Sequence, residues 1–359
     1  MQSIKSRDSI VYFGDHTCYQ QLNKYLENTP PSAIFILVDT NTHEHCLAYF
    51  LTNITTQIPI EVIEIEAGEI HKNIETCSGV WNSLSELEAD RKALIINLGG
   101  GVVTDLGGFV ACTFKRGVNY INVPTTLLSM VDASVGGKTG VDLGSLKNMV
   151  GVISESEMVL VMPSFLKTLP SNEIRSGFAE MLKHGLIQDQ NYWERLVQTQ
   201  NIHLEELDGL IHESVIIKNN IVTEDPFERS VRKYLNFGHT LGHAIESYFL
   251  THPEKPSLLH GEAIAIGMIT EAYLSMKLLN LPENNLKEIS ENFTKIYPAV
   301  PILEEDYQAI FDLLIFDKKN ESGKILFVLL EQIGVPKYNC EVPVELLSES
   351  LNYYNRINS

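Results

Sequence analysis

The stretch ALIINLGGGVVTDLGGFVA, residues 93–111, decides the fold of this chain. Residues 93–98 are a short apolar run that predicts a strand, and residues 102–111 have the apolar spacing of a helix. Between them stand three glycines, Gly99, Gly100 and Gly101. The glycines therefore lie at a turn from strand to helix. Such a turn suits a phosphate group, because its backbone N–H groups can approach closely and the helix offers its positive end.

Two common nucleotide-binding motifs do not fit this turn. The dinucleotide fingerprint would need a third glycine or an alanine where Thr104 stands. The sequence GGKT at residues 136–139 imitates the end of a P-loop, but the earlier glycine of that motif would fall on Asp132. A triple glycine alone is often an ordinary tight turn, so the residues that follow it carry the argument.

Charged residues among small ones follow the turn. Asp105 comes directly after Thr104, and the cations from Lys115 to Lys147 follow within a short distance. Their number alone would fit a solvated face. Lys138, however, lies among glycines and small residues that offer little apolar surface for its stem. Its position therefore favours an anionic ligand.

The composition is that of a globular protein long enough for two domains, with 359 residues and 44% hydrophobic residues. The formal net charge of −19 argues against nucleic acid or an anionic membrane as a partner. Five scattered cysteines, none in a C-x-x-C pair, indicate reduced thiols without a zinc–thiolate site. Residues 1–5 lack an apolar signal region and no run approaches a membrane span, so we expect a cytoplasmic protein.

Short strands alternate with helical patterns up to about residue 167, which predicts an α/β layer with a Rossmann-like, mostly parallel sheet. Strand signals largely vanish after residues 158–161, and the rest reads as an all-α domain. We therefore expect domains at residues 1–168 and 169–359. Asp39 directly follows the clearest strand, residues 33–38. It could accept ribose hydroxyls there or cap the helix near Thr42, and the pattern leaves both open.

The helical half carries a second group of reactive side chains. Glu180 shares a helix face with Lys183 and His184 by spacing, although such a face is usually solvated. His239 and His243 lie four residues apart among small and apolar neighbours, a spacing that can serve one metal ion.

A third histidine, His260, begins a strongly apolar helix. Thr240 follows His239 where the metalloprotease motif H-E-x-x-H needs glutamate, which excludes that reading. One glutamate and two histidines would suit a catalytic zinc with an open position. A packed pair of histidines remains the alternative, and spacing does not decide which three residues would bind the metal.

These motifs resemble those of the 3-dehydroquinate synthases, the shikimate-pathway members of the sugar phosphate cyclases, nearly from end to end. The resemblance is carried by GGGVVTDLGGF (99–109), KRG (115–117), VPTTLL (123–128), MVDASVGGKTG (130–140), NFGHTLGHAIE (236–246) and DKKN (317–320). Residues 143–148 depart from the family, in which many members have a proline-containing loop and a glycine before the lysine.

The resemblance implies a role for each matching residue. The metal ligands would be Glu180, His239 and His260, while His243 faces the substrate. Catalytic and substrate-binding positions would be Arg116, Asp132, Lys138, Asn148, Lys183, Lys218, Arg232, Asn236, His243 and Lys318. Cofactor-binding positions would be Asp39, Asn41, Glu69, Lys72, Gly99, Gly100, Gly101, Val102, Val103, Thr104, Asp105, Thr125, Thr126, Lys138, Lys147, Phe165 and Thr168. Each cation could individually be a surface charge, but their joint occurrence at matching separations favours a site.

The implied reaction converts a seven-carbon sugar acid phosphate into a carbocycle with loss of phosphate. NAD would oxidise the substrate transiently and be regenerated, and zinc, cobalt or another divalent metal would act as Lewis acid. The family resemblance also implies a homodimer. Three rivals remain: a cyclase for a sugar phosphate without the carboxylate, a metal-dependent alcohol dehydrogenase of related fold, and a non-catalytic metal-binding protein. Lys218, Arg232 and Lys318 favour the acid substrate.

Overall fold

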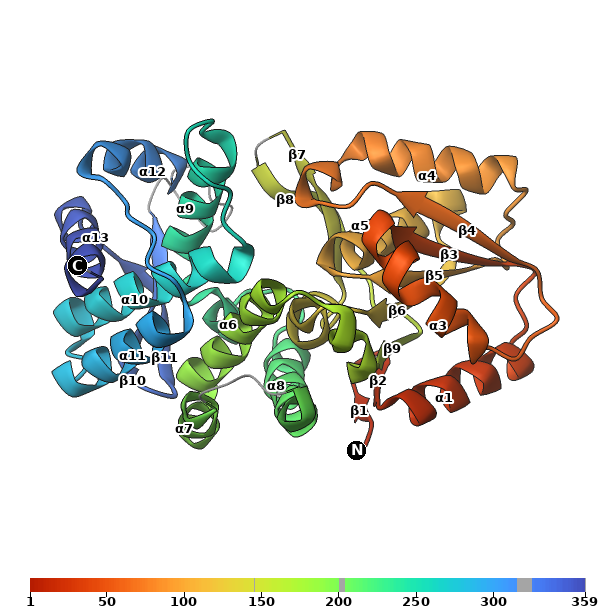
Figure 1. Ribbon diagram of the computed structural model, residues 1–359, viewed down its shortest axis with the longest axis horizontal. Coiled ribbons are helices and arrows are strands. Elements are labelled where there is room, and N and C mark those ends of the chain that lie inside the picture. Colours follow the sequence, from red (N-terminus) through yellow and green to blue (C-terminus); the bar gives the residue numbers. More distant parts are fainter. Residues whose placement is uncertain (145, 200–203, 315–324, 359) are drawn as a thin grey trace. The chain divides into compact units, whose positions relative to one another are not determined.

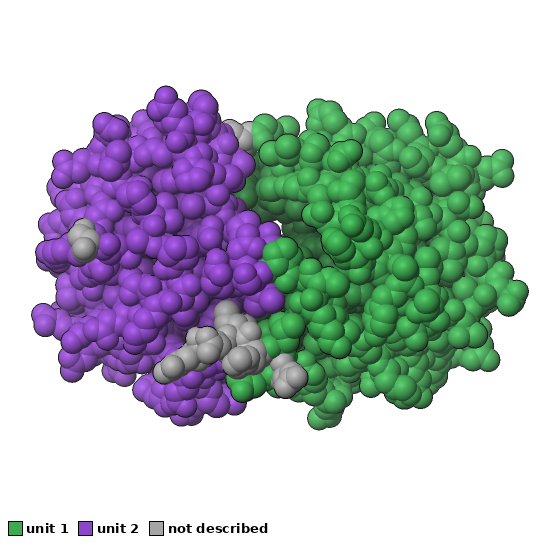
Figure 2. Space-filling model, viewed as in Figure 1, with its two compact units in different colours: residues 1–170, 204–223 green, residues 171–203, 224–359 purple. Residues whose placement is uncertain are grey.

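The computed structural model describes residues 1–144, 146–199, 204–314 and 325–358. The chain divides into two compact units (Figure 2). The first unit comprises Met1–Pro170 and Leu204–Thr223, and the second comprises Ser171–His203 and Glu224–Ser359. Residues Leu204–Thr223, which the sequence analysis expected in the second domain, thus pack with the first unit.

The first unit is built on a seven-stranded sheet (Figure 1). Its strands, in spatial order, are β1 (Ile4–Lys5), β2 (Ile10–Phe13), β9 (Met158–Val161), β6 (Asn119–Pro124), β5 (Leu94–Gly99), β3 (Ile34–Asp39) and β4 (Ile60–Ile65). All neighbouring strands run parallel except β1 and β2. The predicted α/β layer with a mostly parallel sheet is confirmed.

Strands β3 and β5 are neighbours in the interior of the sheet, and their apolar runs are buried along almost their whole length. β3 has strand β4 on one side and β5 on the other, with Leu37 opposite Asn97. The chain therefore returns from the sheet edge to the far side of β3, which makes a topological switch point. Asp39 and Gly99 end these two strands at the same edge, where open α/β sheets bind their ligands.

The α-helices of the first unit are α1 (Asp15–Asn28), α2 (Thr40–Thr42), α3 (Ala48–Thr52), α4 (Ile74–Glu86), α5 (Gly101–Thr113) and α8 (Leu204–Glu224). Side chains of α4 and α5, including Val80 and Leu106, form one buried apolar cluster with Phe35 and Ile95 of the sheet. Shorter turns of 3-10 or π helix occupy His43–Leu47, Glu69–His71, Phe114–Arg116, Ser129–Ala133, Pro163–Thr168, Val231–Asn236 and Glu304–Asp306.

A separate hairpin follows the glycine-rich motif of the first unit. Strands β7 (Lys138–Leu143) and β8 (Leu146–Ile153) pair antiparallel, with Gly140 opposite Gly151. A Cβ on Gly140 would lie 2.5 Å from the carbonyl oxygen of Val150, so only glycine permits this approach. The sequence analysis described residues 143–148 as a loop and did not expect these strands.

The second unit is predominantly helical. Its helices are α6 (Ser171–Gln188), α7 (Gln190–Gln198), α9 (His239–Thr251), α10 (His260–Leu279), α11 (Glu283–Ile296), α12 (Tyr307–Leu314) and α13 (Val344–Ile357). α10 is its central element, packed against α6, α9, α11 and α13 and buried from Gly261 to Ser275 save for Glu262. Among the described residues, none of the helices has the length and hydropathy that a membrane span requires.

The expectation of a helical second domain is confirmed, and the structure adds one hairpin to it. Strands β10 (Leu326–Gln332) and β11 (Val335–Glu341) form an antiparallel hairpin beside α10. Gly334 takes a φ of 83° at its turn, a conformation that favours glycine. The apolar run of β10 is buried from Phe327 to Leu330, and a run of that length does not by itself distinguish a strand from a buried helix.

Candidate functional site

The glycine turn of the first unit lies between β5 and α5. Gly100 precedes the first residue of α5, and no side chain in the described part of the chain caps this helix through that position. The backbone N–H of Thr125, at the end of β6, donates to the carbonyl of Gly99 at 3.0 Å. A Cβ on Gly100 would lie 3.0 Å from Cγ2 of Thr126. The turn therefore has the bare backbone and uncapped helix end that fit a pyrophosphate group.

The other predicted cofactor residues near this edge have local partners of their own. Val102, Val103 and Thr104 belong to the first turn of α5. Asp39 caps α2, because its Oδ1 accepts the backbone N–H of Thr42 at 2.8 Å. The capping alternative is thus realised, and the cofactor role of Asp39 stays a prediction. Asn41 is exposed beside it.

A buried ion pair joins three segments of the first unit. Nζ of Lys72 donates to Oδ2 of Asp105 at 2.6 Å and to Oδ1 of Asn148 at 2.7 Å. Burial would lower the pKa of Lys72, but the charges of Asp105 and Glu69 outweigh it and raise that pKa above its ordinary value. Asn148 has a φ of 52° and donates its backbone N–H to Asp142 at 2.6 Å. Lys72 therefore links α5, through Asp105, to β8, through Asn148.

Three further predicted cofactor residues lie in the first unit. Nζ of Lys147 is 3.4 Å from Oε1 of Glu69, in a pair more exposed than that of Lys72. The buried ring of Phe165 packs edge-on against Tyr49, with centroids 5.8 Å apart. The hydroxyl of Thr168 donates to the carbonyl of Phe165 at 3.2 Å, within the turn Pro163–Thr168.

Three of the predicted catalytic residues of the first unit, Arg116, Asp132 and Lys218, lie on separate elements. Nζ of Lys218, on α8, donates to Oδ1 of Asp132 at 2.8 Å and also to its backbone carbonyl. Arg116 is exposed in a left-handed turn with a φ of 67°. That conformation is uncommon for a residue with a side chain. Arg116 adopts it directly before Gly117, the glycine of the KRG motif.

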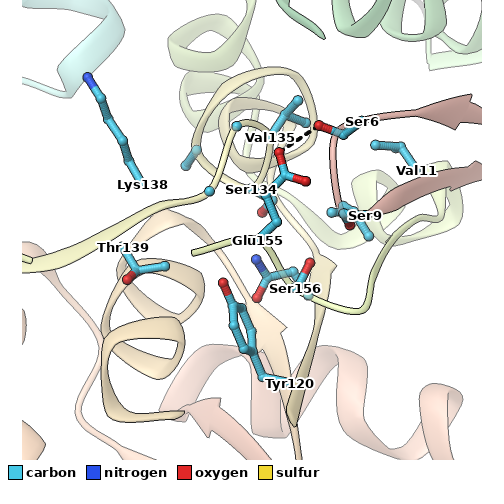
Figure 3. A pocket seen from close by; sticks show the side chains of 15 residues that line it. Ser6, Ser9, Val11, Tyr120, Ser134, Val135, Lys138, Thr139, Glu155 and Ser156 are labelled. Atoms are coloured by element: carbon cyan, nitrogen blue, oxygen red, sulfur yellow. Dashed lines mark hydrogen bonds between the residues drawn. The ribbon is translucent and has the colours of Figure 1, made fainter. Parts of the chain in front are cut away.

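A small cavity of the first unit lies beneath the loop that precedes β7 (Figure 3). Ser6 donates to Oε1 of Glu155 at 2.7 Å on its wall. Lys138 is the one predicted site residue among those that line it, and its side chain points away from the other labelled residues (Figure 3). We therefore regard this cavity as part of the packing of the loop.

The second unit brings a carboxylate and two imidazoles together. Glu180 of α6 is fully buried, which excludes a solvated helix face. Its Oε1 lies 3.4 Å from Nε2 of His239 and 3.5 Å from Nε2 of His260. The three residues come from α6, α9 and α10, so the packing of these helices creates a cluster that no short motif contains.

The hydrogen bonds behind the two rings define the chemistry of the cluster. Nδ1 of His239 lies 3.0 Å from the carbonyl of Phe237, and Nδ1 of His260 lies 3.2 Å from Oε2 of Glu246. Both oxygens are acceptors, so each Nδ1 carries a proton and Nε2 of each ring faces Glu180. Neutral rings would turn the lone pairs of both Nε2 atoms toward the carboxylate, and that arrangement would require a cation among them.

A proton or a metal ion would meet that requirement. Burial would lower the pKa of His260, but the carboxylates of Glu246 and Glu180 outweigh it and raise that pKa to about 9. Carboxylate and imidazole ligands whose second nitrogen is held by an acceptor are typical of zinc and similar divalent ions. The donor set therefore fits the metal that the family resemblance implies.

His243 lies close to the same cluster. Ligand atoms of His239, His243 and His260 all lie within 4.8 Å of one another, so geometry alone also offers a set of three histidines. The assignment of His243 to the substrate stays a prediction. Lys183, which is 1% exposed, donates from Nζ to Oε2 of Glu180, so it neutralises the buried carboxylate in this structure.

Close helix crossings position the cluster. A Cβ on Gly267 of α10 would lie 1.9 Å from the carbonyl oxygen of Gly238, directly before α9. A Cβ on Gly261 would lie 2.1 Å from the carbonyl oxygen of Ser176 on α6. The side chain of Ser176 also accepts the backbone N–H of Gly261 at 2.9 Å. These glycines let α6, α9 and α10 approach closely enough for their side chains to meet.

The remaining predicted residues of the second unit lie on the turn Val231–Asn236. Arg232 is 3% exposed, and its Nη1 donates to the carbonyl of Pro226 at 2.7 Å. Nδ2 of Asn236 donates to Oε1 of Glu228 at 2.7 Å. Asp225 accepts the backbone N–H groups of Ser230 and Arg232 at 2.6 and 3.2 Å. Lys318 lies outside the described residues.

Sequence reasoning assigned no role to three acidic residues that the structure places beside site residues: Asp225, Glu228 and Glu246. Glu246 had a visible signal, because it follows His243 by three residues in the same motif. Its contact with His260 depends on the crossing of two helices and could not be read from spacing.

Comparisons with known proteins identify the family. The family model for the 3-dehydroquinate synthase N-terminal part matches residues 62–176, and the model for the C-terminal part matches residues 177–320. A 3-dehydroquinate synthase of Parabacteroides distasonis is 41% identical over 336 residues, which cover 93% of this chain and 94% of that protein.

Solved structures agree with this relationship. A 2-deoxy-scyllo-inosose synthase in complex with carbaglucose-6-phosphate, NAD+ and Co2+ is similar with a TM-score of 0.86 and 25% identity, covering 98% of this chain and 99% of that one. A 2-epi-5-epi-valiolone synthase from Streptomyces hygroscopicus with NAD+ and Zn2+ bound is similar with a TM-score of 0.84 and 25% identity, covering 99% of both chains. The chain belongs to the 3-dehydroquinate synthase family.

Proposed function

We propose that this member of the 3-dehydroquinate synthase family converts 3-deoxy-D-arabino-heptulosonate 7-phosphate into 3-dehydroquinate and inorganic phosphate. The reaction would be a phosphate-eliminating, carbon–oxygen lyase reaction that uses NAD and a divalent metal, with zinc as the metal we favour. The observation that carries the proposal is the convergence of Glu180, His239 and His260 in a chain that a 3-dehydroquinate synthase matches over 93% of its length.

The two cofactors would supply hydride transfer and Lewis acidity when bound. NAD would be held at the bare end of α5 after Gly100, and the metal by Glu180, His239 and His260. Two neighbours of similar fold were solved with NAD+ and with Co2+ or Zn2+, which supports this pair of cofactors.

The chain's own residues would bind the anionic substrate and move its protons. Buried or half-buried cations, such as Lys183, Lys218 and Arg232, would hold the phosphate and the carboxylate and neutralise the charge that develops. His243, beside the metal cluster, would contact the substrate and could exchange a proton with it. We assign residues 1–168 to NAD binding and residues 169–359 to metal and substrate binding.

The family also suggests how the protein exists in the cell. We propose a homodimer in the cytoplasm, which acts on a small sugar acid phosphate and binds neither nucleic acid nor membrane. The net charge of −19 supports the last part, because it repels polyanionic surfaces.

Phosphate release is the experiment that tests the function. Purified protein loaded with zinc should release phosphate from the heptulosonate phosphate only when NAD is present. A sugar phosphate that lacks the carboxylate, such as glucose 6-phosphate, serves as the matched substrate. Turnover of that sugar phosphate without turnover of the acid would replace this proposal with the related cyclase.

A further inference from the structure

Helix α10 contains a fully buried carboxylate to which the proposed function gives no role. Glu271 is 0% exposed. Its Oε2 accepts the backbone N–H of Gly238 at 2.6 Å, and its Oε1 accepts those of Thr240 and Leu241 at 3.1 and 3.2 Å. Three backbone donors from one segment therefore converge on a single side chain of a different helix.

These three donors belong to the start of α9, which carries His239 of the metal cluster and, beside the cluster, His243. His239 is the first residue of α9, and His243 lies one turn later. Gly238 precedes the helix in a left-handed conformation and has no side chain that could cap it. Glu271 supplies the acceptor that a capping residue would otherwise provide.

The charge of Glu271 also matters at this place. The first turn of a helix carries a partial positive charge, equivalent to roughly half an elementary charge. His239 lies in that turn, so a metal ion bound to it would be repelled by the helix end. A carboxylate on the same backbone N–H groups offsets that repulsion and fixes the direction of the first turn.

We propose that Glu271 is a positioning residue that sets the affinity of the Glu180–His239–His260 centre for its metal. It acts through the backbone of α9, because the three hydrogen bonds described above all come from backbone N–H groups. The inference rests on the proposed metal dependence of the protein.

Simple stabilisation of the fold is the competing explanation, and α9 offers a matched control at its other end. Asp306 is 2% exposed and accepts the hydroxyl of Tyr248 and Nζ of Lys255, each at 2.6 Å. Asp306 is thus a buried carboxylate that contacts the same helix through Tyr248, which lies more than two turns after His239. Loss of its charge should destabilise the unit without changing the metal centre.

The experiment compares the full-length wild type with Glu271→Gln and Asp306→Asn. Zinc affinity is measured by competition with a chromophoric chelator, and the thermal midpoint is measured with and without zinc. The absorption spectrum of the cobalt-substituted protein reports the geometry of the ligands. We expect Glu271→Gln to bind zinc about tenfold more weakly and to shift the cobalt spectrum. Asp306→Asn should lower the midpoint of the metal-free protein but keep the wild-type affinity.

The outcomes separate this inference from the proposed function. Equal zinc affinity and equal cobalt spectra for wild type and Glu271→Gln would overturn the inference and leave the metal proposal intact. A wild type that binds neither zinc nor cobalt would overturn the metal proposal itself. If Glu271→Gln does not fold, Glu271→Asp replaces it, because its shorter side chain keeps the charge but cannot reach all three donors. Weaker zinc binding by Glu271→Asp supports the inference, and wild-type affinity with a lowered midpoint overturns it.

Discussion

At the scale of single residues, the arrangement of lone pairs around Glu180 explains why a cation belongs in the second unit. Phe237 and Glu246 hold the protons of the two imidazoles on Nδ1, so both rings face the carboxylate with Nε2. Without a proton or a metal ion, three acceptor atoms would face one another inside a buried cluster. Such an arrangement would cost several kcal/mol, so a cation between these atoms would stabilise the cluster, as the ammonium of Lys183 does at the other oxygen of Glu180.

The first prediction concerns the ligands of this cation. We expect Glu180→Ala, His239→Ala and His260→Ala to lose bound zinc, since each removes one of the converging acceptors. His243→Ala should keep its zinc while losing rate, because the family places that residue on the substrate. Metal content after dialysis against a chelator and reloading measures both effects. Full zinc in Glu180→Ala and loss of zinc in His243→Ala would instead establish a centre of three histidines.

The second prediction concerns the buried ion pair of the first unit. Asp105→Asn leaves the ammonium of Lys72 buried without its anionic partner, and it should lower the free energy of unfolding by about 3 kcal/mol. Lys147→Gln is the matched control, because it breaks the more exposed pair with Glu69 but keeps the carboxylates that act on Lys72, and it should cost less than about 1 kcal/mol. Fluorine resonances of 5-fluorotryptophan report each unit separately in urea, since Trp81 and Trp193 lie in different units. Equal losses in the free energy of unfolding for the two variants would contradict the prediction that burial makes the Lys72–Asp105 pair the more important one.

Residue types and spacing predicted much of the metal cluster but little of what surrounds it. His239 and His243 are visible as a pair at helical spacing, whereas the contact between His260 and Glu246 requires two helices to cross. Asp39 shows the opposite case. Its position after a strand suggested two roles, and the capping bond to Thr42 is a local interaction that the sequence alone could express.

At the scale of elements, the crossing of α9 and α10 holds the cluster together. The third prediction tests this crossing with Gly267→Ala, whose Cβ would lie 1.9 Å from the backbone oxygen of Gly238. Because a backbone atom cannot rotate away, the helices must separate, and we expect a loss of about 3 kcal/mol together with weaker zinc binding. Gly79→Ala in the exposed face of α4 meets nothing within 4 Å and is the control. It should stabilise the protein by about 0.5 kcal/mol. Wild-type zinc affinity in Gly267→Ala would show that the crossing does not set the site.

The fourth prediction concerns the pH dependence of stability that arises from Tyr248 and Asp306. The hydrogen bond between these two side chains joins α9 to the turn Glu304–Asp306. Burial would raise the pKa of Asp306, but hydrogen bonds from Lys255 and Tyr248 outweigh it and hold the pKa below its ordinary value of 3.8. The same bond raises the pKa of Tyr248 to about 12 from 10.0. The ionised Asp306 therefore stabilises the folded unit above pH 3.8, and this stabilisation is lost as the pH falls below that value. The protonated Tyr248 stabilises the folded unit up to pH 10.0, and this stabilisation is lost as the pH rises to about 12.

Urea midpoints of the second unit should therefore fall at both ends of the pH range. Asp306→Asn should flatten both declines, because it removes the titrating acid and the partner that shifts Tyr248. A variant with wild-type pH dependence would contradict the assignment.

The sequence predicted the elements of the first sheet better than the hairpins. Strands β3 and β9 contain uninterrupted apolar runs, and β5 is apolar except for Asn97, so their local pattern matches their buried positions. The hairpin β7–β8 is rich in glycine, and its pairing of Gly140 with Gly151 depends on close backbone approach that composition does not reveal. The run of β10 is apolar enough for a helix, and it forms a strand here by pairing with β11 beside α10.

At the scale of the whole molecule, a net charge of −19 and an anionic substrate oppose each other. We therefore expect substrate binding to depend on a few cations that are held in place, such as Lys218 beside Asp132 and the buried Arg232. These cations also separate the synthase from an oxidoreductase of related fold. A dehydrogenase needs the glycine turn and the metal, but it has no use for groups that hold a leaving phosphate.

The fate of the hydride is consequently the last prediction. If the oxidation is transient, the hydride returns to the substrate after phosphate has left, and each NAD molecule serves many turnovers. We expect phosphate release in many-fold molar excess over the NAD supplied, without a lasting rise in NADH absorbance. The two signals should be recorded in one cuvette, with a coupled phosphate assay beside absorbance of the nicotinamide. NADH that accumulates in proportion to consumed substrate, with phosphate retained in the product, would identify a dehydrogenase, because only that reaction leaves the electrons on the cofactor.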